Sequence, residues 1–295
     1  MPGKKEETSM PGRSGLTSEK TMKIAFLGDI VGRPGRNFVM EQLRPLRRDH
    51  GLDFIVANGE NAAGGSGINT RIATSLRNSG VDGITLGDHV WDEKGFTREI
   101  GKLNWLCRPA NLPSANPGKT SLLIEMNGLK LGVVTVLGRQ FMKTHADCPF
   151  LTARKYVEDL KAQGAQAVIL EIHAETTSEK IAMGWYMDGL CSLVVGTHTH
   201  VPTADHKVLP RGTAYITDVG MCGPYKSVLG RDIEPVLGRF LDGVPRRFSV
   251  ATEDVAIRGC IIETDDSSGL AISIVPLHIQ QPAETPAQDT ESEEE

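Results

Sequence analysis

The sequence predicts an α/β fold in which a mostly parallel sheet is joined by a later set of antiparallel strands. Two observations predict it. Over the first two hundred residues, short apolar runs alternate with segments of helical periodicity, a pattern typical of parallel sheets. Beyond residue 210, the segments TAYITDV, RRFSVA, GCIIET and LAISIVP are short, β-branched and separated by Gly, Pro and Asp. These segments indicate antiparallel strands that close a second sheet.

Three helices can be placed from periodicity and capping signals. Residues 70–79 and 152–163 carry apolar side chains at helical spacing. Each segment runs up to a glycine, Gly80 or Gly164, at the position of a helix C-terminal cap. Thr176, with an acidic residue three positions later, matches a capping box. A third helix should therefore begin just after residue 176.

The two ends of the chain differ from its middle. Residues 1–21 are polar and rich in Gly, Ser and charge, and residues 280–295 form a Pro-containing acidic segment. Neither stretch has apolar side chains to bury, so both are expected to be disordered. Residues 22–279 are the expected folded domain. Met10 and Met22 offer alternative translation starts.

The charge of the folded body differs from that of the whole chain. The formal net charge is -5. Six acidic residues lie in the C-terminal segment: Glu284, Asp289, Glu291, Glu293, Glu294 and Glu295. The body is therefore close to neutral, which argues against binding of long nucleic acid. A small nucleotide needs only local positive charge, which metal ions can supply.

Cysteine usage and hydropathy indicate a cytoplasmic protein. The five cysteines include no CxxC pair, so reduced thiols are expected. No run approaches the roughly 18 apolar residues of a membrane helix, and no secretion signal is present. A membrane partner is not expected, and a homo-oligomer is compatible with the sequence. The motifs GxxxxGK[ST], GxGxxG, GxSxG and HExxH do not occur.

Five apolar runs each end on side chains that can bind a metal ion. These are Asp29 after KIAFLG, Glu60 and Asn61 after FIVANG, Asp88 and His89 after GITLG, His173 after AVILEI, and His198 and His200 after LVVGT. The carboxyl ends of neighbouring parallel strands meet at one crevice, so these groups should converge. Carboxylates and imidazoles gathered in this way are typical of a metal site. They exceed what one tetrahedral ion can take, which favours two ions that share a carboxylate.

Several of these residues can be assigned a role from their chemistry. Glu60 is the natural bridge because a carboxylate has two oxygens, whereas Asn61 offers only a neutral amide oxygen. His198 and His200 lie two positions apart where a strand gives way to a loop, so their rings can diverge and serve different ions. The alternative is a pair of ordinary polar histidines. Asp29 could instead cap the N-terminus of a helix.

His89 is the candidate general acid. A phosphoester cleavage needs a proton on the leaving oxygen, and an imidazole that does not bind metal can supply it near neutral pH. The alternative is a histidine that only hydrogen-bonds its neighbours. Three further carboxylates, those of Glu175, Asp205 and Asp218, could orient the metal-binding side chains through hydrogen bonds. We favour a helix-cap role for Glu175 and turn roles for Asp205 and Asp218.

Eight motifs in fixed order resemble the YmdB-type branch of the calcineurin-like metallophosphoesterases. They are GDIVGRPGR, NGENAAGG, GDHVWD, RPANLP, HAETTSEK, GWYMDG, GTHTHVPTAD and GTAYITDVGMCGP, between about Met22 and residue 277. The resemblance implies a four-layer αββα sandwich. It also implies a dinuclear metal centre and phosphodiesterase activity toward cyclic nucleotides, 2′,3′-cyclic ones in particular.

The resemblance also implies a ligand set. It assigns one ion to Asp29, Glu60, Asn61 and His200, and the other to Glu60, Asp88, His173 and His198, with His89 as the proton donor. The commoner family motif is GNH, where this chain has GDH. An anionic Asp88 should hold its ion more tightly and make bound water less acidic, so we expect metal binding with a shifted pH optimum.

The expected reaction is attack on phosphorus by a hydroxide held by two ions, with protonation of the leaving sugar oxygen by His89. Mn or Fe suits the mixed carboxylate, amide and imidazole ligands, and Zn is compatible with them. Two alternatives remain open: a phosphomonoesterase or nucleotidase that uses the same metals, and a regulatory protein whose catalysis is incidental.

Overall fold

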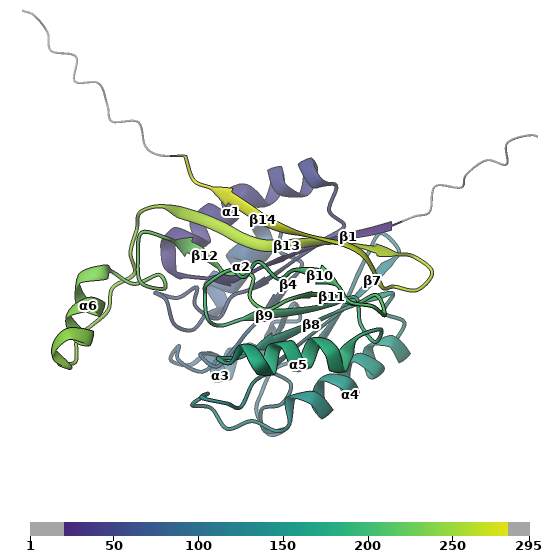
Figure 1. The fold of residues 1–295 in the computed structure, drawn as a ribbon, viewed down its shortest axis with the longest axis horizontal. Coiled ribbons are helices and arrows are strands. Elements are labelled where there is room, and N and C mark those ends of the chain that lie inside the picture. The colour runs from purple at the N-terminus through teal and green to yellow at the C-terminus, as the bar shows by residue number, and fades with distance from the viewer. Residues whose placement is uncertain (1–20, 283–295) are drawn as a thin grey trace, which may run out of the picture.

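Two β-sheets pack face to face, and helices cover their outer faces (Figure 1). The computed structural model describes residues 21–282, so the predictions of disorder for 1–21 and 280–295 lie mostly outside the described residues; they were wrong for Thr21 and Gln280, which belong to strands. The first strand begins at Thr21 and the last ends at Gln280. The expected four-layer αββα arrangement is confirmed.

The first sheet has eight strands and contains the earliest parts of the chain. Its order is β2 (Asp29–Ile30), β12 (Met221–Pro224), β13 (Val255–Asp265), β1 (Thr21–Leu27), β3 (Phe54–Asn58), β4 (Gly83–Thr85) and β5 (Leu106–Cys107), and β14 (Ala271–Gln280) also pairs with β13. Strands β1, β3, β4 and β5 are mutually parallel, whereas β13 is antiparallel to β1 and β14.

The second sheet has six strands from the middle of the chain. Its order is β10 (Lys207–Val208), β11 (Ala214–Ile216), β9 (Leu193–Thr197), β8 (Ala167–His173), β7 (Leu129–Leu137) and β6 (Ser121–Met126). The four central strands, β11, β9, β8 and β7, are parallel. Only β6 and β10 at the edges run antiparallel to their neighbours.

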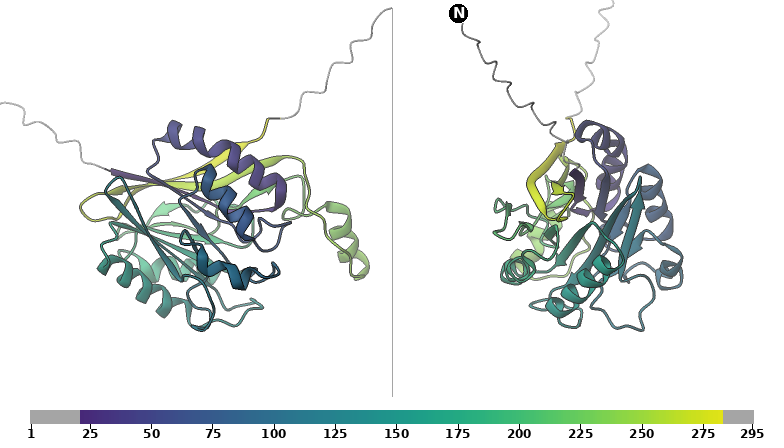
Figure 2. Two further views of the ribbon diagram at one scale, coloured as in Figure 1. Left: turned by 180° about the vertical axis from the view of Figure 1, so that it is seen from behind. Right: turned by 90° about the vertical axis from the view of Figure 1, so that its right-hand side faces the viewer.

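Helices cover both outer faces, as the two further views in Figure 2 show. The helices are α1 (Gly32–His50), α2 (Thr70–Ser79), α3 (Phe96–Glu99), η1 (Ile100–Lys102), α4 (Pro149–Ala162), α5 (Thr177–Met187) and α6 (Ile233–Asp242). Helices α1 and α2 lie against the first sheet, α4 and α5 lie against the second, and α6 projects from the body. Within residues 21–282, none of the helices has the length and apolar character needed to cross a bilayer.

Three apolar layers hold these four layers together. In β3, Ile55 and Ala57 pack toward α1 and α2, whereas Phe54 and Val56 pack between the sheets. Both faces of β3 are therefore buried in apolar layers. A strand buried on both faces has apolar residues at successive positions, which explains why FIVA carries no polar residue. A third layer joins α4 and α5 to the second sheet and includes Val157.

Two of the predicted helices form close to their expected limits. Helix α2 spans residues 70–79 and ends at Gly80, as predicted. Helix α4 ends at Ala162, just before Gly164, but begins earlier than predicted, with Pro149 in its first turn. Proline is compatible with the first turn because its missing N–H has no partner there.

The third predicted helix begins where expected, but the capping interaction was predicted wrongly. Helix α5 starts at Thr177 after the cap residue Thr176, whose side chain makes no capping hydrogen bond. The carboxylate of Glu179 instead accepts the backbone N–H groups of Arg139 (3.0 Å) and Gln140 (3.0 Å). The acidic residue therefore ties the helix start to the loop after β7.

The prediction for the C-terminal strands was partly wrong. Strands β13 and β14 are antiparallel, but they extend the first sheet rather than close the second. Strand β11 is parallel to β9, and residues 246–251 form no strand beyond a single bridge at Val250. Strand propensity reflects fit to a half-buried pleated surface and does not specify the partner. At Gly259, a Cβ would lie 2.3 Å from the carbonyl oxygen of Phe26, so this pairing requires a glycine.

We predict that Phe54→Ala destabilises the fold by about 3–5 kcal/mol, because it opens a cavity between the two sheets. Phe54 is completely buried and lies at the start of β3, away from the strand end. Urea unfolding would measure the change. Phe240→Ala is the matched control, since that side chain is 81% exposed and should alter stability by no more than about 0.5 kcal/mol. Equal stability losses in both variants would contradict this assignment of the core.

Candidate metal centre

The predicted metal-binding side chains all lie at carboxyl ends of strands. Asp29 lies in β2, directly after β1, and Glu60 follows β3. Asp88 follows β4, His173 is the last residue of β8, and His198 follows β9. The first three come from the first sheet and the two histidines come from the second.

Four of these residues form one compact cluster. Glu60, Asp88, His173 and His198 each offer a ligand atom within 4.8 Å of the others. His173 is completely buried, and its Nε2 lies 3.1 Å from Glu60 Oε1, 3.1 Å from Asp88 Oδ1 and 3.0 Å from His198 Nδ1. Side chains far apart in the sequence thus meet at one point.

The remaining predicted ligands border this cluster. Asn61 Nδ2 lies 3.1 Å from Glu60 Oε1 and 3.3 Å from His200 Nε2. Asp29 accepts the backbone N–H of His198 at 3.2 Å through Oδ2. All seven side chains predicted as ligands are therefore brought together.

The arrangement fits divalent metal ions. The buried oxygen Asp29 Oδ1 has no hydrogen-bond partner among the described residues. Unpaired buried oxygens of this kind are costly unless a cation or a donor compensates them. Gly87 also leaves space at the cluster, because a Cβ there would lie 2.1 Å from Glu60 Oε2 and 2.4 Å from His173 Nε2.

The charges in the cluster stabilise one another. Burial alone lowers the pKa of His173, but the nearby carboxylates of Glu60, Asp88 and Asp29 outweigh it and raise that pKa well above its usual value. Burial alone raises the pKa of Asp88, but His173 and His198 reverse the effect and leave it well below the usual range. The cluster therefore favours the ionised form of Asp88, the state in which a carboxylate can bind a cation.

The backbone of residues 197–200, the THTH segment, explains how its two imidazoles diverge. His198 has φ +91° and His200 has φ +63°, so both lie in the left-handed region. His198 turns toward His173, whereas His200 turns toward Asn61 and places its Nδ1 3.2 Å from the Leu229 carbonyl. The predicted divergence is thus present, and it arises from two unusual backbone conformations.

The capping alternative for Asp29 is excluded. Helix α1 has Val31 as its N-cap residue and makes no side-chain capping hydrogen bond. The Asp29 carboxylate is completely buried and faces the backbone of His198 instead. No helix-capping role competes with a role at the cluster.

His89 lies beside the cluster and is held by a residue that the sequence analysis missed. Its Nδ1 is 2.8 Å from Asp92 Oδ2 and 3.2 Å from Ser66 Oγ, and its backbone N–H points to Glu60 Oε2 at 3.3 Å. Burial alone lowers the pKa of His89, but Glu60, Asp88 and Asp92 raise it overall. The i, i+3 spacing within GDHVWD was the available signal for Asp92.

The role favoured for Glu175 was wrong, and the turn role of Asp218, whose carboxylate accepts the Gly220 N–H at 2.7 Å, is only part of what that residue does. Glu175 Oε2 lies 3.2 Å from His198 Nε2, so it contacts the candidate ligand and does not cap helix α5. Asp218 is completely buried and accepts both the backbone N–H and the hydroxyl of Thr199. Both carboxylates reach the THTH segment from parts of the chain whose pairing the local sequence does not reveal.

The turn role of Asp205 is supported. Its carboxylate accepts the hydroxyl of Thr203, two residues earlier, at 2.7 Å. It also accepts the backbone N–H of Thr217 at 3.1 Å and the hydroxyl of Thr217 at 2.5 Å. Asp205 therefore joins this turn to the end of β11.

A buried polar network behind His173 was also missed. Glu171 Oε1 accepts hydrogen bonds from Asn58 Nδ2 (2.6 Å) and Thr197 Oγ1 (2.7 Å), and Thr197 Oγ1 lies 2.9 Å from His173 Nδ1. Burial raises the pKa of Glu171. The acidic residue inside the otherwise apolar run AVILEI was a signal for this network.

A hollow of about 300 Å³ opens over the cluster. Its lining includes Glu60, Asn61, His89, Glu175, His198, His200 and Arg231. Arg231 donates to the Gly64 carbonyl at 3.0 Å and also contacts the Gly65 carbonyl. It thereby fixes the loop that carries Glu60 and Asn61.

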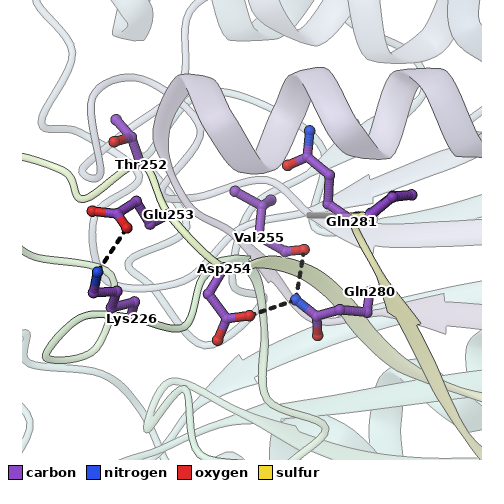
Figure 3. Close-up of a pocket in the computed structure, with 8 residues that line it drawn as sticks. Lys226, Thr252, Glu253, Asp254, Val255, Gln280 and Gln281 are labelled. Carbon is purple, nitrogen blue, oxygen red and sulfur yellow. Dashed lines mark hydrogen bonds and ion pairs between the residues drawn. The ribbon is translucent and has the colours of Figure 1, made fainter. Parts of the chain in front are cut away.

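A larger hollow, of about 690 Å³, lies elsewhere (Figure 3). Four of its polar side chains pair with one another: Lys226 pairs with Glu253 at 2.7 Å, and Gln280 donates to Asp254 at 2.8 Å. No candidate ligand lines it. Among the described residues, the chemistry is therefore concentrated at the smaller hollow.

The remaining histidines and the cysteines do not join the site. His50, His145, His206 and His278 are exposed. Cys222 is buried, and burial raises the pKa of its thiol to about 12, which agrees with an unreactive cysteine. None of the five cysteines belongs to the four-residue cluster.

Comparisons with known proteins agree with this site and fold. A 2′,3′-cyclic-nucleotide 2′-phosphodiesterase of Bacillus subtilis (strain 168) is 46% identical over 253 residues, covering 86% of this chain and 95% of the relative. A phosphatase from Mycoplasma pneumoniae superposes with a TM-score of 0.83 at 33% identity, covering 89% of this chain and 94% of the other. A hypothetical protein from Thermus thermophilus gives a TM-score of 0.82 at 39% identity, covering 88% of this chain and all of the other (100%).

These structural relatives confirm the metallophosphoesterase fold that the motifs predicted. The model of the YmdB-like protein family matches residues 25–277, which include every candidate ligand and nearly all of the described chain. This chain belongs to the YmdB-like protein family.

Proposed function

We propose that this protein is a dinuclear metal-dependent phosphodiesterase that hydrolyses cyclic nucleotides, with 2′,3′-cyclic nucleotides as its substrates. The observation that carries the proposal is the convergence of three carboxylates, an amide and three imidazoles, of which Glu60, Asn61, His198 and His200 line one hollow. The Bacillus subtilis relative supports the substrate class by its name.

The proposed ligands divide into two sets that share Glu60. One ion is assigned to Asp29, Glu60, Asn61 and His200, and the other to Glu60, Asp88, His173 and His198. The division follows the observed divergence of His198 and His200. A half-turn of the Asn61 amide would present its oxygen where Glu60 and His200 meet.

The proposed metals are Mn or Fe, because these ions suit carboxylate, amide and imidazole ligands together, and Zn is also compatible. When bound, such a pair acts as a Lewis acid that activates water and counters charge on the phosphoryl oxygens. Asp88, which replaces the commoner neutral ligand, would add one negative charge to its set.

His89 is the proposed general acid. It lines the hollow, and its Nδ1 is engaged by Asp92 at 2.8 Å. Its Nε2 has no hydrogen-bond partner among the described residues, so this nitrogen can carry a proton toward the leaving sugar oxygen. Asp92 would fix the tautomer and the ring orientation.

We predict that the purified protein contains two Mn, Fe or Zn ions per chain and opens a 2′,3′-cyclic nucleotide faster than it cleaves a 3′,5′-cyclic nucleotide or a simple monoester. Elemental analysis and initial rates on the three substrates would test this, and a chelator should abolish turnover. A preference for the monoester would instead establish a phosphomonoesterase on the same residues.

We predict that His89→Ala lowers kcat by about 100 to 10,000 fold while metal content stays at the wild-type level, because only the proton donor is lost. Asp92→Asn should give a smaller loss, since the imidazole remains but its orientation is less fixed. Steady-state kinetics and elemental analysis measure both effects. Unchanged turnover of His89→Ala would remove this residue from the role of general acid.

We predict that Gly87→Ala abolishes metal binding, because the added Cβ would overlap Glu60 Oε2 and His173 Nε2. Metal content after dialysis, measured by elemental analysis, is the readout. Gly101→Ala is the matched control: nothing lies within 4 Å of a Cβ at that position, and its φ is not positive. Full metal content in Gly87→Ala would show that this space is not part of the centre.

A further inference from the structure

The segment that carries His198 and His200 is held in a strained conformation. The left-handed region is unfavourable for residues other than glycine, and such a conformation persists only when its surroundings fix it. Thr199 lies between the two histidines. The contacts of Thr199 therefore influence the direction of both imidazoles.

Asp218 holds Thr199 from behind. Its Oδ2 accepts the Thr199 hydroxyl at 2.7 Å and the Thr199 backbone N–H at 3.2 Å, and its Oδ1 accepts the Gly220 N–H at 2.7 Å. Thr203 adds a second tie, because its hydroxyl accepts the Asp218 N–H at 3.0 Å. The carboxylate thus connects the THTH segment to the chain that follows β11.

Lys180 completes the arrangement from the outer helix layer. Its side chain is completely buried, and its Nζ lies 2.8 Å from Asp218 Oδ2 and 3.3 Å from Thr199 Oγ1. The stem passes close beneath β9, since a Cβ at Gly196 would lie 2.9 Å from Lys180 Cδ. An ammonium from α5 thereby reaches the underside of the THTH segment.

Fold stability alone does not account for this buried ion pair. Removing two charges from water is costly, and well-packed apolar side chains of similar volume often stabilise a protein as well or better. An apolar pair could not accept the N–H and hydroxyl of Thr199, however. The directional hydrogen bonds of the Asp218 carboxylate are what a charged pair adds at this position.

We propose that Lys180 and Asp218 are positioning residues that act through Thr199 to direct His198 and His200 toward different metal ions. Neither residue lines the hollow over the cluster, so neither would touch the substrate. The inference rests on the proposed two-metal centre and adds a determinant of its metal affinity. Hydrogen-bond partners that orient metal-binding residues typically contribute 10–100-fold to metal affinity.

The first test is Mn²⁺ titration of metal-depleted protein by calorimetry. Asp218→Asn keeps the shape but weakens the acceptor and leaves the Lys180 ammonium unpaired, so Mn²⁺ affinity should fall by about 10–100-fold. Asp82→Asn is the matched control. Asp82 is also a buried carboxylate paired with an arginine, Arg47, and it accepts the Ile55 N–H at 2.8 Å, but it precedes β4 at the opposite end of the sheet. The control should lower the melting temperature and leave Mn²⁺ affinity unchanged.

A second pair of variants avoids an unpaired buried charge. Thr199→Val removes the hydroxyl at nearly constant shape and should weaken Mn²⁺ binding, whereas Thr199→Ser keeps the hydroxyl and should bind Mn²⁺ as the wild type does. Wild-type affinity in both Asp218→Asn and Thr199→Val would overturn the inference, as would an equal loss in Asp82→Asn. Wild-type protein that binds neither Mn²⁺ nor Fe²⁺ nor Zn²⁺ in the same titration would overturn the proposed function as well. Metal binding without cyclic-nucleotide hydrolysis would contradict only the proposed function.

Discussion

The packing of one sheet against the other sets the geometry on which the proposed centre depends. Asp29, Glu60 and Asp88 come from strand ends of the first sheet, and His173 and His198 come from the second. The Nε2 of His173 is 3.1 Å from carboxylates that belong to the opposite layer. A small shift between the sheets would change every distance across the site, because closely packed interiors transmit strain rather than absorb it.

Strand alternation links that packing to the chemistry. Phe26, Phe54 and Val56 enter the layer between the sheets, while the neighbouring positions face the helices. Because both faces of these strands are buried, polar residues are concentrated after their ends, where the two sheets open toward the hollow. One exception is Glu171, which lies within β8 and accepts a hydrogen bond from Asn58 of the first sheet across the interlayer region.

The sequence predicted the candidate ligands better than the strand partners. Strand ends could be recognised from apolar runs followed by Asp, Glu or His, and parallel pairing then implied that residues after neighbouring strands, such as Glu60 and Asp88, converge. The partner of β13 could not be predicted, because it depends on a pairing between Leu27 and Gly259 across the length of the chain. The same limit explains why the contact of Asp218 with Thr199 was not predicted: this contact is tertiary, whereas the turn hydrogen bond of Asp218 with Gly220 is local.

The four imidazoles of the site differ in which ring nitrogen contacts a supporting group outside the cluster. The Nδ1 atoms of His89, His173 and His200 meet Asp92, Thr197 and the Leu229 carbonyl, respectively, which leaves each Nε2 directed elsewhere. In His198 the order is reversed, since Nδ1 faces the cluster and Nε2 meets Glu175, whose side chain is 50% exposed. A half-exposed partner fixes a ring less firmly than a buried one. The direction of the His198 ring therefore depends more on the backbone conformation. This dependence explains why a buried pair, Lys180 and Asp218, holds Thr199 in place.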